Sequence, residues 1–148
     1  MPSERSAHAP GRGRLASPVR IVLGLLSAIA IALVATTIIA RVAVAAGADP
    51  GFEPFTFKAY GVFTIAGVLA GFVGWLTIRA LTSRAAVALA ILVPAVLLAS
   101  FIPDLGFLGA WGEPSTIGGI ALMAMHLVIV AVAVPTYQVI APVRFARE

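Results

Sequence analysis

The sequence predicts an all-α membrane protein in which four antiparallel transmembrane helices form one bundle. Hydrophobic residues make up 61% of its 148 residues and charged residues 11%, whereas soluble chains are about 45–50% apolar. A soluble core of this size has no room for so much apolar surface. The apolar residues gather into four runs, each close to the about 20 residues that cross a bilayer. Short connections between the runs place neighbouring helices antiparallel.

The expected elements follow in chain order. Residues 1–19 are basic and rich in Pro, Gly and Ser, which predicts a disordered cytoplasmic tail because they have little to bury. A transmembrane domain follows over residues 20–143, and residues 144–148 form a second cytoplasmic tail. The four spans within the domain are expected at about residues 21–46, 59–79, 85–102 and 117–140.

The second span carries glycines at spacings of three and four residues, at Gly67, Gly71 and Gly74. These positions share one helical face. Lipid gives helices no hydrophobic drive to associate, so small residues that permit close backbone approach favour packing there. We expect this face to contact another helix, either within the chain, in a second copy or in another membrane protein.

Lys and Arg are distributed unevenly over the chain. Eight of the ten lie in the two tails or beside the connection between the second and third spans, and the other two are Arg41 and Lys58. Cytoplasmic segments of membrane proteins are enriched in these residues. Both termini are therefore expected in the cytoplasm, in a multi-pass protein of the cytoplasmic membrane. The net charge of +4 then reflects orientation in the bilayer and does not indicate a nucleic-acid partner.

The two connections on the other side are rich in aromatic residues, in the sequences "GFEPFTF" and "LGFLGAW". Aromatic rings favour the headgroup level of a bilayer. The simpler interpretation is an aromatic belt, and the sharper one is a lid over a cavity between the helices.

His126 lies in the middle of the fourth span, about 13 Å below its start at 1.5 Å per residue. Counting inward along the other spans places Thr36, Thr37 and Pro94 at a similar depth. Pro94 leaves a carbonyl on its own helix without a donor, and a neutral imidazole both donates and accepts. We expect His126 to be buried, to face the bundle and to hydrogen-bond near Pro94 or near Thr36 and Thr37. No acid lies within the expected spans to pair with it.

Arg41 and Asp104 form a second candidate constellation, at the outer ends of the first and third spans. Two alternatives stand for Arg41. Its side chain either snorkels to the interface or pairs with Asp104 and thereby ties the first span to the third.

These features favour a non-enzymatic membrane protein with a structural, accessory or scaffold role. The alternative is a small transporter or channel component that uses His126 as a protonatable site at the membrane midplane. The sequence has no cysteine, no nucleophile–base pair and no phosphate-binding glycine loop. A lone histidine supplies one ligand where zinc takes three or four. We therefore expect no catalytic residues, no metal and no cofactor, and the lipid bilayer as the main partner.

The chain resembles a family of small four-helix integral membrane proteins of actinobacteria, a family without an established activity. The resemblance covers residues 20–143 and rests on the four-span layout, the Arg-flanked second connection, "SFIPDL" and, most specifically, "MHLVIVAVAVP" in the last span. It implies a four-span membrane protein and brings no reaction, cofactor or site residue.

Overall fold

The computed structural model describes residues 14–109 and 114–143. Within these ranges it is all-helical and has no strand, as the sequence predicts. The elements in order are α1 (Pro18–Ala45), η1 (Glu53–Phe55), α2 (Phe57–Leu81), α3 (Ala85–Ser100), η2 (Pro103–Phe107) and α4 (Pro114–Ile140), where η denotes a short 3-10 helix.

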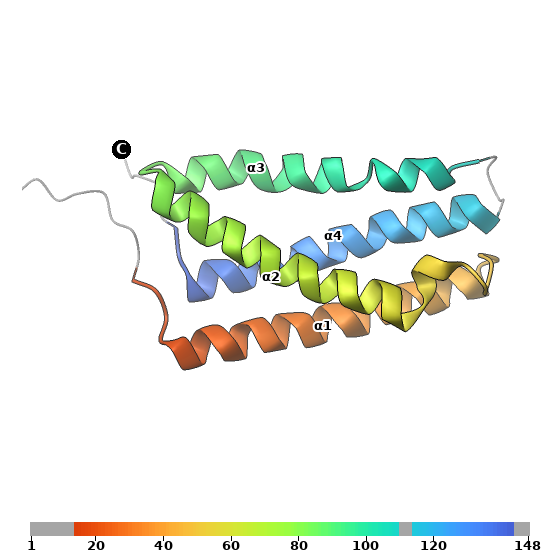
Figure 1. Ribbon diagram of the computed structural model, residues 1–148, viewed down its shortest axis with the longest axis horizontal. Coiled ribbons are helices and arrows are strands. Elements are labelled where there is room, and N and C mark those ends of the chain that lie inside the picture. The colour runs from red at the N-terminus through yellow and green to blue at the C-terminus, as the bar shows by residue number, and fades with distance from the viewer. Residues whose placement is uncertain (1–13, 110–113, 144–148) are drawn as a thin grey trace, which may run out of the picture.

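Among the described residues, four stretches are long and apolar enough to cross a membrane: Pro18–Ala45, Phe57–Leu81, Ala85–Phe107 and Ser115–Ile140. They match the expected spans with one difference. The third continues beyond residue 102 through η2 to Phe107, because the backbone stays helical at Phe101 and Ile102 and η2 runs on in line with α3 (Figure 1). The two expected tails lie largely outside the described residues.

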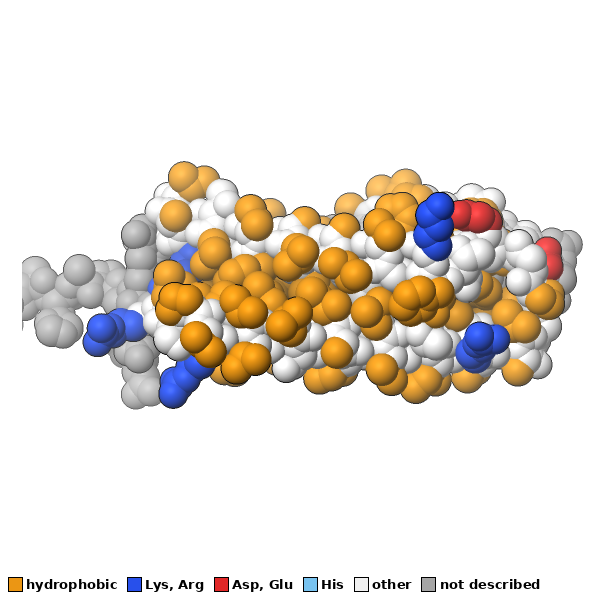
Figure 2. Space-filling view, turned by 60° about the horizontal axis from the view of Figure 1, so that its bottom comes forward, with side chains coloured by type: hydrophobic (Ala, Val, Ile, Leu, Met, Phe, Trp, Pro, Cys, Tyr) orange, Lys and Arg blue, Asp and Glu red, His pale blue; other side chains and the backbone are white. Residues whose placement is uncertain are grey.

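The helices lie side by side along the long axis of the molecule (Figure 1). The start of α1, the turn between α2 and α3 and the end of α4 gather at one end, which we call the arginine end. The segments η1 and η2 lie at the opposite end, which we call the acidic end. A band of hydrophobic side chains covers the surface between them, and Asp and Glu side chains are visible only at the acidic end in this view (Figure 2).

The helix boundaries have local causes. Ser17 caps α1 by accepting a hydrogen bond from the backbone N–H of Arg20, with Pro18 at the first helical position. Gly47 follows the end of α1 with φ of 109°, a left-handed conformation that favours glycine. Thr56 caps α2 through the N–H of Ala59. Side-chain caps and a glycine thus set the bounds of the first two helices.

Alanines line the buried face of α1, and small side chains there allow close approach to α4. They are Ala28, Ala32, Ala40 and Ala43, each at most 5% exposed. The larger core side chains come from α2 and α4 near the arginine end, where Val68, Phe72 and Trp75 pack with Tyr137 and Ile140.

Two hydrogen bonds fix α2 against the end of α4. The Tyr137 hydroxyl donates to the Val68 carbonyl, and the Trp75 indole N–H donates to the Ala141 carbonyl over 2.9 Å. Polar tips of buried aromatic residues thereby find partners that lipid does not offer.

The glycine face of α2 does not act as one contact surface within the chain. A Cβ at Gly71 would lie 2.8 Å from the Tyr137 hydroxyl oxygen, whereas a Cβ at Gly67 or Gly74 would meet no described atom within 4 Å. The reason is that the buried face of α2 is formed by Val68, Phe72 and Trp75, and the glycines lie beside that face. Only Gly71 therefore makes the expected intramolecular contact, and Gly67 and Gly74 remain open.

Candidate functional site

The candidate site is a carboxylate–imidazole pair at the acidic end. α3 ends at Ser100, and η2 continues in line with it (Figure 1), where Asp104 lies beside α4. The Asp104 Oδ2 atom lies 3.1 Å from His126 Nδ1. Asp104 is only 5% exposed, so an ionisable side chain is buried within the third apolar stretch.

The backbone of η2 places this carboxylate. The N–H groups of Asp104 and Leu105 both donate to the Phe101 carbonyl, over 3.0 and 3.1 Å, so helical hydrogen bonds continue from α3 into η2. Gly119 on α4 makes room for it, because a Cβ there would lie 3.2 Å from the Asp104 carbonyl oxygen and 3.2 Å from Phe107 Cβ. The position of Asp104 thus depends on a glycine on the neighbouring helix.

The imidazole of His126 is held on one edge and open on the other. Nδ1 and Asp104 Oδ2 are both buried and 3.1 Å apart, and neither has a hydrogen bond among the described residues. The His126 side chain as a whole nevertheless stays 37% exposed, against 7% for Asp104. The ring also packs on Phe101, with centroids 6.2 Å apart.

The arrangement brings a carboxyl group and an imidazole together. A carboxylate accepts hydrogen bonds and an imidazole N–H donates them, so the two groups are chemically complementary. The described residues contain no group of three or more His, Cys, Asp or Glu side chains that could hold a metal ion.

Thr36 and Thr37 make other contacts than the expected one with His126. The Thr36 hydroxyl donates to the carbonyls of Ala32 and Leu33, over 2.9 and 3.2 Å. The Thr37 hydroxyl lies 2.7 Å from the Leu33 carbonyl and 3.0 Å from the Tyr60 hydroxyl. Since Thr37 has one proton to donate, Tyr60 is the donor to Thr37. These threonines satisfy their own helix and join α1 to α2.

Pro94 is not a partner of His126 either, because it lies on an exposed face of α3. A long side chain on a helix points toward that helix's N-terminus. The imidazole therefore points toward η2 rather than toward the middle of α3. The expectation that no acid lies at this depth is wrong, because the third stretch stays helical beyond residue 102 and η2 brings Asp104 against α4.

The Arg41–Asp104 pair of the sequence analysis is not the arrangement found. Asp104 lies against His126, and Arg41 is exposed with no ion-pair partner among the described residues. The cause is the order of the helices, because α1 and α3 lie on opposite sides of the bundle (Figure 1). Of the two alternatives for Arg41, the one that stays a prediction is a side chain that snorkels to the interface.

The aromatic residues of the two outer connections contact each other. Phe52 packs edge-on against Phe55 and against Phe107 of η2, with centroids 5.0 Å apart in both cases. A Cβ at Gly118 would lie 3.0 Å from the Phe52 ring, so this ring also rests on α4. The rings therefore connect η1, η2 and α4 at the acidic end, as a lid over that end would. Trp111, which belongs to the same aromatic set, lies outside the described residues.

Sequence signals for the pair were present but incomplete. His126 is identifiable as a polar residue within an apolar run, and Asp104 as an acid next to a proline. Nothing in the sequence spacing indicates that residues 22 positions apart would meet.

No family model, curated protein or solved structure matches the chain.

Proposed function

We propose that the chain is a non-enzymatic, multi-pass protein of the cytoplasmic membrane that serves as a component of a small proton-linked transporter or channel. Its four helices cross the bilayer antiparallel to their neighbours, with both termini in the cytoplasm. Asp104 and His126 bind and release the proton. Membership of the actinobacterial four-helix family belongs to the same proposal and is supported by the four-span layout.

The membrane arrangement is supported by how the helix ends pair. The N–H of Ala16 donates to the Ile140 carbonyl over 2.9 Å, so the start of α1 lies beside the end of α4. A Cβ at Gly47 would lie 3.5 Å from the Ile117 side chain, so the end of α1 lies beside the start of α4. Opposite directions of α1 and α4 account for both contacts.

The orientation is supported by charge. By their places in the element order, Arg14, Arg20, Arg79 and Arg84 belong to the arginine end, whereas Asp49, Glu53 and Asp104 belong to the acidic end together with Arg41 and Lys58. The positive-inside rule then places the arginine end in the cytoplasm.

The observation that carries the proton-linked role is the burial of Asp104 beside His126. Ionisable residues within membrane spans are expensive and commonly mark ion or proton pathways. A buried ion pair is also weak support for a purely structural role, because apolar side chains of similar size often hold a fold equally well. The pair therefore favours the protonatable site over the structural or scaffold role. The scaffold role remains the opposing outcome of the test.

The test asks whether the Asp104 carboxyl changes its protonation state. The full chain is reconstituted in liposomes, and infrared difference spectra are recorded between about pH 5 and pH 8, the range in which histidines commonly titrate. We expect a carboxyl band that Asp104→Asn removes and His126→Gln shifts. Wild-type protein should also dissipate an imposed pH gradient faster than either variant.

Asp49→Asn is the matched control. Asp49 is an exposed acid at the same end, and its carboxylate accepts a hydrogen bond from the Gly51 N–H over 2.8 Å. This variant should retain the Asp104 band and the rate of gradient dissipation. Identical difference spectra for wild type and Asp104→Asn would refute the proton-linked role and leave the pair as a structural contact.

A further inference from the structure

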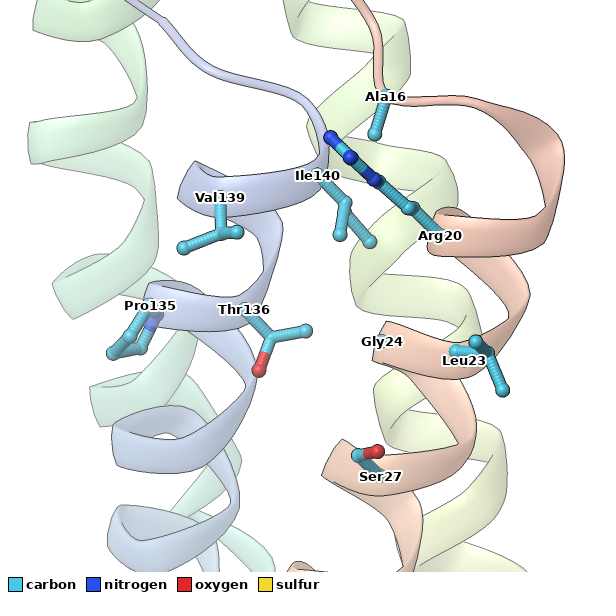
Figure 3. A pocket seen from close by; sticks show the side chains of 9 residues that line it. All are labelled: Ala16, Arg20, Leu23, Gly24, Ser27, Pro135, Thr136, Val139 and Ile140. Carbon is cyan, nitrogen blue, oxygen red and sulfur yellow. The ribbon is translucent and has the colours of Figure 1, made fainter.

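A cleft opens between the start of α1 and the end of α4, at the arginine end and away from the Asp104–His126 pair. Its volume is about 490 Å³, within the roughly 300–1,000 Å³ of pockets that bind small molecules. Figure 3 shows side chains from both helices facing this space, with Arg20 at its upper end and Ser27 at its lower end.

Gly24 lets α1 approach α4 closely along the cleft, and Thr136 presents an apolar surface to it. A Cβ at Gly24 would lie 2.9 Å from the Ile140 side chain and 3.5 Å from the Thr136 methyl group. The Thr136 hydroxyl donates to the Val132 carbonyl on its own helix over 2.9 Å, so its methyl group faces α1. Leu23, Pro135 and Val139 complete the apolar walls.

Arg20 gives the mouth of the cleft a positive charge. Its side chain is exposed and has no ion-pair partner among the described residues. In Figure 3 the guanidinium extends from α1 toward the chain that leaves α4 beyond Ile140. The N–H of Ala16 bonds to the Ile140 carbonyl over 2.9 Å and joins the two helices at this level. A charged head and an apolar groove below it are thus presented together.

We propose that this cleft binds an anionic phospholipid, with the headgroup phosphate on Arg20 and one acyl chain in the groove beside Gly24. An arginine guanidinium matches the planar, bidentate geometry of a phosphate. Basic residues at the cytoplasmic surface attract anionic lipids. The charge is complementary to the phosphate, and the walls are complementary to a hydrocarbon chain. This inference rests on the membrane orientation proposed above and is independent of the proton-linked role.

Native mass spectrometry of the full chain in mild detergent tests the site. Phosphatidylglycerol is compared with phosphatidylethanolamine of the same acyl chains, and with glycerol phosphate, which is an anionic phosphate without an acyl chain. We expect one tightly retained phosphatidylglycerol, weaker retention of phosphatidylethanolamine and no retention of glycerol phosphate. Arg20→Gln should weaken phosphatidylglycerol binding about fivefold, the factor expected for one interfacial cation.

Two matched pairs of variants separate the site from general lipid affinity. Arg41→Gln removes another exposed arginine of α1, at the opposite end, and should leave retention unchanged. Leu23→Trp fills the groove, whereas Leu26→Trp changes a neighbouring position of the same 57% exposure that does not line it. We expect Leu23→Trp alone to reduce retention several-fold.

Equal retention of the two lipids, or equal losses in Arg20→Gln and Arg41→Gln, would overturn the proposal. A dimer that forms without added lipid and that Leu23→Trp dissociates would also overturn it, because the groove would then hold a second copy of the chain. Since these readouts do not involve the proton, they are unaffected if Asp104 proves not to titrate.

Discussion

Gly119 and Asp104 decide together how the third apolar stretch meets α4. The glycine has no side chain where η2 crosses the helix, and the nearest η2 atoms would lie 3.2 Å from a Cβ at that position. This closeness lets the Asp104 carboxylate reach His126 at 3.1 Å. Gly119 therefore controls the contact between Asp104 and His126.

Replacing Gly119 by alanine should accordingly displace η2. We expect Gly119→Ala to lower the free energy of unfolding by about 1–3 kcal/mol, the usual cost of forcing an extra methyl group into a packed site. The midpoint of thermal unfolding in detergent measures this. Gly106→Ala, where a Cβ would meet no described atom within 4 Å, is the control. Equal stability of the two variants would show that the close approach at Gly119 is unimportant.

At the scale of elements, α2 contacts α4 through large side chains and a single glycine. Gly71 lies under the Tyr137 hydroxyl, which donates to the Val68 carbonyl. Gly67 and Gly74 lie on the same helix and remain open. The spacing of the glycines thus shows that they share one side of α2, but it does not show which of them contacts another helix.

Gly71→Ala should push the Tyr137 hydroxyl away from Val68 and destabilise the bundle by about 1–3 kcal/mol. Gly67→Ala should leave the stability of the monomer unchanged. Thermal unfolding of both variants at a dilution that keeps the protein monomeric provides the comparison. If Gly67→Ala instead weakens self-association in concentrated samples, then Gly67 contacts a second copy, as the sequence analysis allowed.

At the scale of the whole molecule, charge and hydropathy divide the protein into two polar ends and an apolar middle (Figure 2). The arginine end contains the exposed turn between α2 and α3, and the acidic end contains η1 and η2. This polarity is what the proposed orientation rests on.

Cysteine labelling tests the orientation directly, because the chain has no native cysteine. In intact cells we expect a membrane-impermeant maleimide to label Pro50→Cys, before η1, but not Ser83→Cys, in the turn before α3. Ser83→Cys should react once the membrane is permeabilised. Both native residues are exposed, so access to the probe depends on the side of the membrane. The reverse pattern would invert the topology.

The sequence by itself determined the helical class and the positions of four apolar stretches. Each of these depends on local composition, because about 20 apolar residues suffice to favour a helix that can span lipid. The unusual status of His126 is equally local, since a titratable side chain within an apolar run is visible in the sequence. The asymmetry of basic residues is likewise a property of composition along the chain.

Only the tertiary structure decided what His126 contacts. Its partner depends on the continuation of the third stretch through η2, the close approach at Gly119 and the direction of the imidazole, none of which a hydropathy pattern records. The order of the helices also excluded the Arg41–Asp104 pair, because α1 and α3 lie on opposite sides of the bundle (Figure 1). The cleft at Arg20 likewise arises from two segments more than a hundred residues apart. Local composition sets where helices form, whereas side-chain partners follow from how the helices pack.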